Sequence, residues 1–180
     1  AMPDLVSESG RALSAHHAVL VTNVTATETL PRAAGNGADD DPPVIRGLAD
    51  VLARCDEREP EESFLEAEHL LEEGRNLFLY GDLPLRDRAR LEPLYNAILE
   101  RVADRLDPEH RRHRELGERI RYRLSAKYFI NLSIFQSLPD IWAIDQVFPI
   151  VPLSRLDEEP TERAVLEDLT CDSDGRIDHY

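Results

Sequence analysis

Four stretches of helical periodicity fill residues 44–126, and they constrain the fold of this chain more than any other feature. In each stretch apolar residues recur at every third or fourth position, which is typical of a helix that buries one face. The apolar faces include Val44 and Leu48, Phe64 and Leu71, Leu91 and Ile98, and Leu116 and Ile120. Because the connections between the stretches are short, the sequence predicts a bundle in which consecutive helices pack antiparallel.

Two prolines mark expected helix boundaries within this bundle. Asp107-Pro108 predicts the start of the fourth helix, with a carboxylate at the N-cap and proline at the first helical position. Pro93 is compatible with the third helix only in its first turn, because an interior proline removes a backbone hydrogen bond.

Segments with strand character flank the bundle on both sides. Residues 18–25, rich in β-branched side chains, predict a strand, and residues 29–43 predict a mobile linker. After the bundle, the sequence predicts a strand over 128–135, a turn at 138–140, an extended edge segment over 147–153 and a strand over 164–170. We expect the first strand and the last three to share a sheet, which gives an α+β fold with the bundle inserted into a β-domain.

The formal net charge of −15 limits the classes of partner. A polyanion is repelled by nucleic acid and by anionic membrane surfaces, so neither is expected as a partner. Such a charge would attract a cationic ligand such as arginine or a polyamine, although acidic surfaces often serve solubility alone. The charge is uneven: residues 39–75 carry 13 acidic residues and 4 arginines, whereas residues 101–126 carry 8 arginines and 5 acidic residues. Facing helices of opposite charge would therefore attract each other.

The expected compartment is the cytoplasm. No apolar run approaches the ~20 residues of a membrane span, and no signal-peptide pattern is present. Cys55 and Cys171 occur in unrelated contexts and do not indicate a disulfide framework, which favours a reducing environment.

A first motif with chemical potential is Ser7-Glu8-Ser9-Gly10-Arg11. Arg11 and the backbone at Gly10 could bind a phosphate group, and the Glu8 carboxylate could hold a proton on a ring nitrogen. Taken alone, the motif is weak, because Glu-x-Gly-Arg also occurs by chance as a turn with a surface ion pair.

A second motif is Thr170-Cys171-Asp172-Ser173-Asp174-Gly175. It combines a weak acid, Cys171, with Asp172, a carboxylate that could accept paired hydrogen bonds from a guanidinium group. The alternatives are a small buried cysteine and a plain loop. An EF-hand calcium loop is excluded, because the required glycine and glutamate are not at their positions.

Taken in order, the motifs resemble bacterial biosynthetic arginine decarboxylases, which belong to the pyridoxal-phosphate (PLP)-dependent, ornithine-decarboxylase-like enzymes. The similarity is carried by residues 7–13, 15–17, 128–131, 135–137, 142–146, 148–149 and 168–174. It covers roughly the first 25 and last 55 residues closely, and the helical insert in position and length. Ser9 departs from the Glu-Pro-Gly-Arg pattern of the wider family, a departure that bacterial arginine decarboxylases share.

The resemblance implies a division of the chain into five parts. Residues 1–17 would end a PLP-binding β/α barrel, and residues 18–28 would form the first strand of the β-domain. The linker over 29–43, the helical bundle over 44–126 and an incomplete β-domain over 127–180 would follow.

The resemblance also implies conversion of L-arginine to agmatine and carbon dioxide, on the route to putrescine and spermidine. Glu8 would contact the pyridine nitrogen of PLP, and Gly10 and Arg11 its phosphate. Cys171 would return a proton to the substrate bound to the neighbouring subunit, and Asp172 would contact the substrate guanidinium. A homodimer or higher homo-oligomer with a shared active site follows from this arrangement.

Two further assignments follow from the resemblance alone. Asp145 would contact the distal end of the substrate, with a helix-capping or turn role as the alternative. Mg²⁺ is implied by the family, although the sequence shows no ligand set for it. His110 and His113 lie among arginines, which argues against a metal site, and Trp142 is expected in the core.

The chain is expected to be an enzyme fragment that is inactive alone. Its only lysine, Lys127, precedes a strand of the β-domain, whereas the lysine that binds PLP in the resembled family lies on an early barrel strand. Two other hypotheses stay open: a stand-alone acidic helical interaction module, and an ornithine or diaminopimelate decarboxylase. The helical insert favours the arginine enzyme over the latter.

Overall fold

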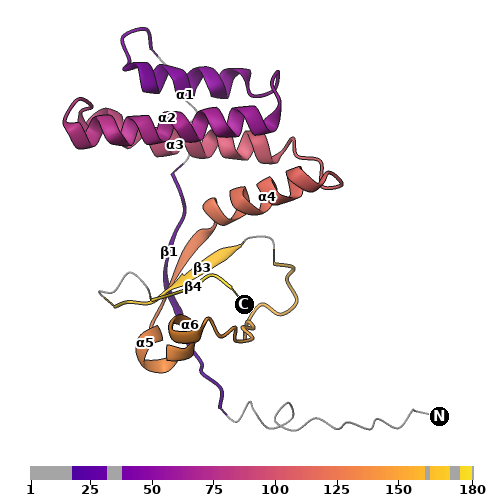
Figure 1. The fold of residues 1–180 in the computed structure, drawn as a ribbon. Helices are drawn as coiled ribbons and strands as arrows, with labels where there is room; N and C mark the ends of the chain where they lie inside the picture. The colour runs from indigo at the N-terminus through magenta and orange to yellow at the C-terminus, as the bar shows by residue number, and fades with distance from the viewer. Residues whose placement is uncertain (1–17, 32–37, 161–162, 171–174, 180) are drawn as a thin grey trace.

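The computed structural model describes residues 18–31, 38–160, 163–170 and 175–179. The four longer helices gather in one part of the molecule, and a small sheet with two short helices forms the other (Figure 1). Helix α4 leads from the first part to the second. This arrangement agrees with the expected α+β class. The predicted barrel segment, residues 1–17, lies outside the described residues, and the predicted domain boundaries stay predictions.

Four helices form the bundle. They are α1 (Pro43–Arg54), α2 (Pro60–Tyr80), α3 (Leu85–Ala103) and α4 (Arg111–Arg123). Proline at the first position favours the start of α1 and of α2, because its missing N–H would have no partner there. Gly81 follows the last residue of α2 as its C-cap, and its φ of 84° is the left-handed conformation that glycine adopts without steric cost.

The first three helices lie side by side, and their apolar faces build one core (Figure 1). Phe64, Leu91 and Ile98 are almost completely buried, as the periodicity predicted. The side chains of Leu116 and Ile120 bring α4 into the same core. The prediction of a helical bundle in the middle of the chain is therefore confirmed.

Two boundary predictions in the bundle are wrong. Pro93 lies well inside α3, which begins eight residues earlier at Leu85. The neighbouring core residues Leu91 and Leu94 are buried, and this packing offsets the hydrogen bond that proline cannot donate. Helix α4 begins at Arg111 rather than at Pro108. The Asp107 carboxylate accepts from the Glu109 N–H at 2.9 Å, as an N-cap would, but His110 has an extended backbone with φ −84° and ψ 123°, so the helix starts only after it.

The acidic and basic halves of the bundle do meet. Glu68 of α2 accepts from Arg123 at 2.8 Å and from Arg119 at 3.5 Å, both on α4. Arg101 of α3 pairs with Asp56 at 3.1 Å in the turn after α1. Since these side chains are partly exposed, each pair is worth only about 0–1 kcal/mol.

The sheet has four strands in the order β1-β2-β3-β4. They are β1 (Val24–Glu28), β2 (Ala126–Ile130), β3 (Ala164–Glu167) and β4 (Arg176–Ile177). Strand β2 pairs antiparallel with β1 and parallel with β3, and β3 pairs antiparallel with β4. Because the bundle lies between β1 and β2 in the sequence, it is an insertion between two neighbouring strands of one sheet.

Several predictions in the sheet part are wrong in detail. The first strand begins at Val24 instead of residue 18, because its register pairs Val24 with Ile130, where β2 ends. The strand predicted over 128–135 ends at Ile130, the last residue of β2. The short helix α5 (Ile134–Ser137) follows it. Its N-cap Ser133 accepts from the Gln136 N–H, a local bond that favours helix over strand.

The following segment also departs from the prediction. Pro139, expected in a turn, begins helix α6 (Pro139–Ile144), and residues 147–153 form no strand. Trp142, expected in the core, is half exposed and packs against Phe135 with ring centroids 5.1 Å apart. The last strand of the sheet is β4, which the sequence pattern did not predict.

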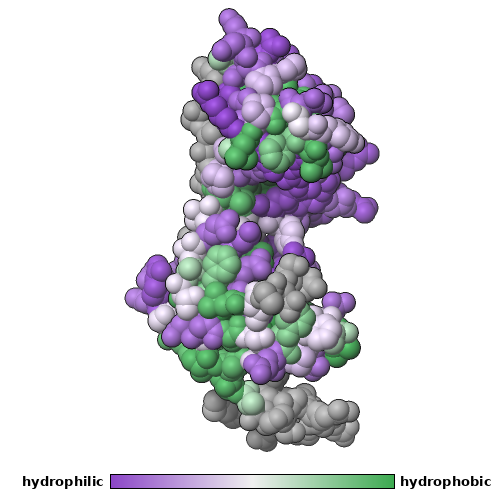
Figure 2. All heavy atoms as spheres, turned by 90° about the vertical axis from the view of Figure 1, so that its left-hand side faces the viewer, coloured by the Kyte–Doolittle hydropathy of each residue, from purple (hydrophilic) through white to green (hydrophobic). Residues whose placement is uncertain are grey.

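On the face shown in Figure 2, the sheet part is more apolar than the bundle. Exposed apolar side chains there include Val19, Val21, Trp142, Ile144, Val151, Leu153, Leu156 and Leu169. A membrane-crossing helix is absent from the described part of the chain, since none of its helices is both long and apolar enough.

Candidate functional site

Most of the predicted site residues lie outside the described residues. These are Glu8, Gly10, Arg11, Cys171 and Asp172, so their predicted roles stay predictions. The structure describes the residues that flank the second motif and the surroundings of Asp145.

Strand β3 leads directly to the second motif. After Glu167, its last residue, Asp168 turns its carboxylate inward and is only 7% exposed. One carboxylate oxygen accepts from the backbone N–H of Thr170 at 3.0 Å and from its hydroxyl at 2.6 Å. The other accepts from the Ile134 N–H at 2.9 Å, and the Asp168 N–H donates to the Gly175 carbonyl at 2.8 Å. The backbone on either side of residues 171–174 is thus tied to one buried aspartate.

The sequence motifs predict no role for Asp168. A signal was nonetheless present, because an aspartate two residues before a threonine is typical of a turn in which the carboxylate accepts from the backbone N–H. The hydrogen bond to Ile134, 34 positions away, could not have been found from this spacing.

Asp145 occupies the C-cap of α6 and is exposed. Its φ of 53° and ψ of 36° place it in the left-handed region, which aspartate tolerates better than most residues. The capping role that was the alternative for Asp145 is therefore present, and its substrate contact stays a prediction.

Lys127 is the only lysine of the chain, and it serves the sheet. It lies in β2 opposite Glu28 of β1, and its Nζ is 3.8 Å from a carboxylate oxygen of that residue. This agrees with the prediction that Lys127 is structural.

Cys55 differs in character from a reactive thiol. It is fully buried in the bundle core, and this burial raises the pKa of its thiol above the ordinary value. At neutral pH Cys55 is therefore protonated and enclosed, which is typical of a structural cysteine.

A metal centre is not indicated by the described part of the chain. The His110 and His113 rings are 4.8 Å apart, and His113 Nδ1 accepts from the Asp107 N–H at 3.0 Å. Within the described ranges, no group of three or more His, Cys, Asp or Glu side chains could hold a metal ion.

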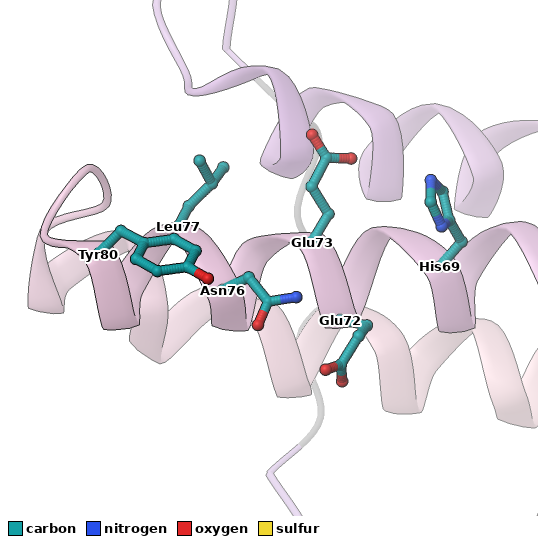
Figure 3. A pocket seen from close by; sticks show the side chains of 6 residues that line it. All are labelled: His69, Glu72, Glu73, Asn76, Leu77 and Tyr80. Carbon is teal, nitrogen blue, oxygen red and sulfur yellow. The ribbon is translucent and has the colours of Figure 1, made fainter.

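A groove of about 300 Å³ lies along the outer side of α2. All its lining residues come from this one helix: His69, Glu72, Glu73, Asn76, Leu77 and Tyr80. Glu73 and Leu77 point to one side of the helix and Glu72 and Asn76 to the other (Figure 3). Because its polar groups do not converge, the groove has no arrangement suited to catalysis.

Comparison with known proteins agrees with the motifs. Residues 38–121 match the model of the arginine decarboxylase helical bundle domain. The biosynthetic arginine decarboxylase of Alkalilimnicola ehrlichii is 49% identical over 180 residues, which cover 99% of this chain and 29% of that protein. The corresponding protein of Pseudomonas aeruginosa is 44% identical over 182 residues, with coverage of 99% and 28%.

A solved structure with the same fold supports this comparison. The crystal structure of the biosynthetic arginine decarboxylase SpeA from Campylobacter jejuni matches with a TM-score of 0.64 and 31% identity. The match covers 88% of this chain and 25% of that one. The chain therefore spans 28–29% of the length of the curated relatives it matches.

Proposed function

We propose that this chain, which is similar to biosynthetic arginine decarboxylases over 99% of its length, is part of an enzyme that converts L-arginine to agmatine and carbon dioxide. Its residues 38–121 are an arginine decarboxylase helical bundle domain, and the resemblance found from the motifs is confirmed. The observation that carries the proposal is the 49% identity, which extends over the helical insert as well as the flanking motifs.

PLP is the cofactor that the chemistry of the chain favours. When bound, PLP withdraws electrons from the α-carbon of an amino acid, so that the carboxylate can leave as carbon dioxide. Glu8 fits the pyridine nitrogen, where its carboxylate would keep a proton in place. Arg11 and the Gly10 backbone fit the phosphate, since they supply a cation and an N–H donor. The family also implies Mg²⁺, which stays a proposal without assigned ligands.

The lysine that binds PLP covalently has to come from another part of the whole protein. Lys127 is held in β2 beside Glu28, as described above. This supports the proposal that the 180 residues are inactive alone.

Two residues of the second motif would act on the substrate. Asp172 would accept hydrogen bonds from the guanidinium group, which favours arginine over shorter amines. The Cys171 thiol of one subunit would donate a proton to the α-carbon of the substrate bound to the other subunit. The active site would therefore be shared in a homodimer or higher homo-oligomer. The sheet part exposes many apolar side chains, which supports the proposal that further parts of the protein cover it. A cytoplasmic location fits this role.

An assay of the whole protein tests the function. Purified with PLP, it should release carbon dioxide from L-arginine with a kcat/KM at least about 100-fold above that for ornithine or diaminopimelate, because a site built for hydrogen bonds rejects substrates that leave its polar groups unpaired. If the protein preferred ornithine or diaminopimelate, it would instead be assigned to the related ornithine or diaminopimelate decarboxylases. A lack of turnover with all three would favour the interaction module.

Asp145 gives a separate prediction. In the whole enzyme, Asp145→Asn should raise the KM for arginine about 10-fold or more, because a hydrogen bond to a charged group is worth about 1.5–3 kcal/mol. Asparagine also tolerates the left-handed backbone at this C-cap, so the melting temperature should stay unchanged. An unchanged KM would leave Asp145 with the capping role alone.

A further inference from the structure

The Asp168 carboxylate is buried, and three hydrogen bonds satisfy it. Two come from the backbone N–H and the hydroxyl of Thr170, and the third from the backbone N–H of Ile134, the first residue of α5. The donors belong to two segments that are far apart in the sequence. Asp168 therefore connects the end of β3 to the segment that follows β2.

The Asp168 backbone also holds the other side of the second motif. Its N–H donates to the Gly175 carbonyl at 2.8 Å, which continues the pairing of β3 with β4. Gly175 is buried and packs directly on the Asp168 carboxylate, so that a Cβ at this position would collide with it. Thr170 and Gly175, the described neighbours of residues 171–174, thus both depend on Asp168.

The charge of Asp168 matters for this arrangement. Burial alone would raise the pKa of Asp168, but the hydrogen bonds from Thr170 and Ile134 outweigh burial and lower it. The carboxylate is therefore ionised at neutral pH and can act only as an acceptor, which suits three donors. An asparagine would present an NH₂ group to at least one of these donors.

We propose that Asp168 is a positioning residue: it holds Thr170 and Gly175, the described residues on either side of the segment 171–174, which contains Cys171. This rests on the proposed function, in which Cys171 delivers a proton to the substrate. Proton delivery depends on geometry, and a displacement of about 1 Å can cost up to about 100-fold in rate. Asp168 itself needs no contact with substrate or cofactor.

The first test is the kinetics of Asp168→Asn in the whole enzyme. We expect kcat for arginine to fall about 10- to 100-fold with bound PLP unchanged, because the misplaced proton donor acts after substrate binding. KM should rise as well, because Asp172 lies in the same segment as Cys171. Gly175→Ala should have the same effect, since its methyl group would displace the carboxylate. Glu167→Gln, the same chemical change one residue earlier, is the matched control and should retain the kcat of the wild type.

A double variant distinguishes positioning from a general loss of structure. If Asp168 acts through Cys171, adding Asp168→Asn to Cys171→Ala should cause no further loss of kcat. Losses that multiply in the double variant would overturn the proposal. Should the wild type prefer ornithine or diaminopimelate, the same comparison on that substrate tests Asp168 independently of the proposed substrate.

Amide hydrogen exchange provides a measurement that does not depend on activity. The Ile134 and Thr170 amides should exchange at least about 10-fold faster in Asp168→Asn than in Glu167→Gln, because they lose their acceptor. Unchanged exchange would overturn the arrangement itself. Faster exchange with an unchanged kcat would overturn the positioning role and leave the proposed function intact.

Discussion

Replacing Cys171 by alanine in the whole enzyme should lower kcat for agmatine formation by about 10²- to 10⁴-fold, the range that a positioned proton donor contributes. The content of bound PLP should stay unchanged, since the residues proposed to hold the cofactor are Glu8, Gly10 and Arg11. Steady-state rates with arginine and the absorbance of bound PLP measure the two quantities separately. An unchanged kcat would remove Cys171 from the mechanism.

The second cysteine provides the matched control. Cys55→Ala also removes a thiol, but from the bundle core, where burial raises the pKa of the group and encloses it. We expect the kcat of this variant to equal that of the wild type. Equal losses from both substitutions would indicate damage to the fold rather than loss of a proton donor.

Mixed oligomers test whether the site is shared. Glu8→Ala and Cys171→Ala subunits should each be inactive alone, and a dimer with one of each has one intact site if Glu8 and Cys171 come from different subunits. Random mixing of equal amounts should then restore about a quarter of the wild-type activity, since half of the dimers are mixed and half of their sites are intact. No recovery would place both residues in the same subunit's site.

The helical bundle could be predicted from the sequence because its signal is local. In α2, Phe64 and Leu71 recur with helical spacing, and both are buried. The start of α4 could not be predicted in the same way. Asp107 does accept from the Glu109 N–H, as an N-cap would, but the extended backbone of His110 delays the start of the helix until Arg111.

The sheet was predicted less well because its limits depend on partners that are distant in the sequence. Residues 18–23 have strand composition but no partner in β2, which ends at Ile130. Conversely, β4 has only two residues, too few for a recognisable alternation, and it exists because it pairs with β3. Pairing rather than composition therefore decides where these strands begin and end.

In the candidate site, too, contiguous motifs could be predicted and contacts between distant residues could not. Its motifs could be recognised because they are contiguous, as in Thr170-Cys171-Asp172. The role of Asp168 could not, because one of its partners, Ile134, is 34 positions away. The sequence thus predicts which groups do the chemistry, whereas the contact between Asp168 and Ile134 comes from the structure alone.

Phe64→Ala should destabilise the 180-residue chain by about 3–5 kcal/mol, because truncating a fully buried aromatic side chain leaves a cavity. Phe64 is 1% exposed on α2, and the Arg119 guanidinium of α4 lies 4.8 Å from its ring centre, so the substitution also loses a contact between two helices. Urea unfolding followed by circular dichroism measures the change.

Leu65→Ala is the matched control: Leu65 adjoins Phe64 but is 60% exposed, so the loss of stability should stay within about 0.5 kcal/mol. If Phe64→Ala unfolds the chain completely, Ile98→Val should still cost about 0.5–1.5 kcal/mol. Similar losses at Phe64 and Leu65 would contradict a core centred on the buried face of α2.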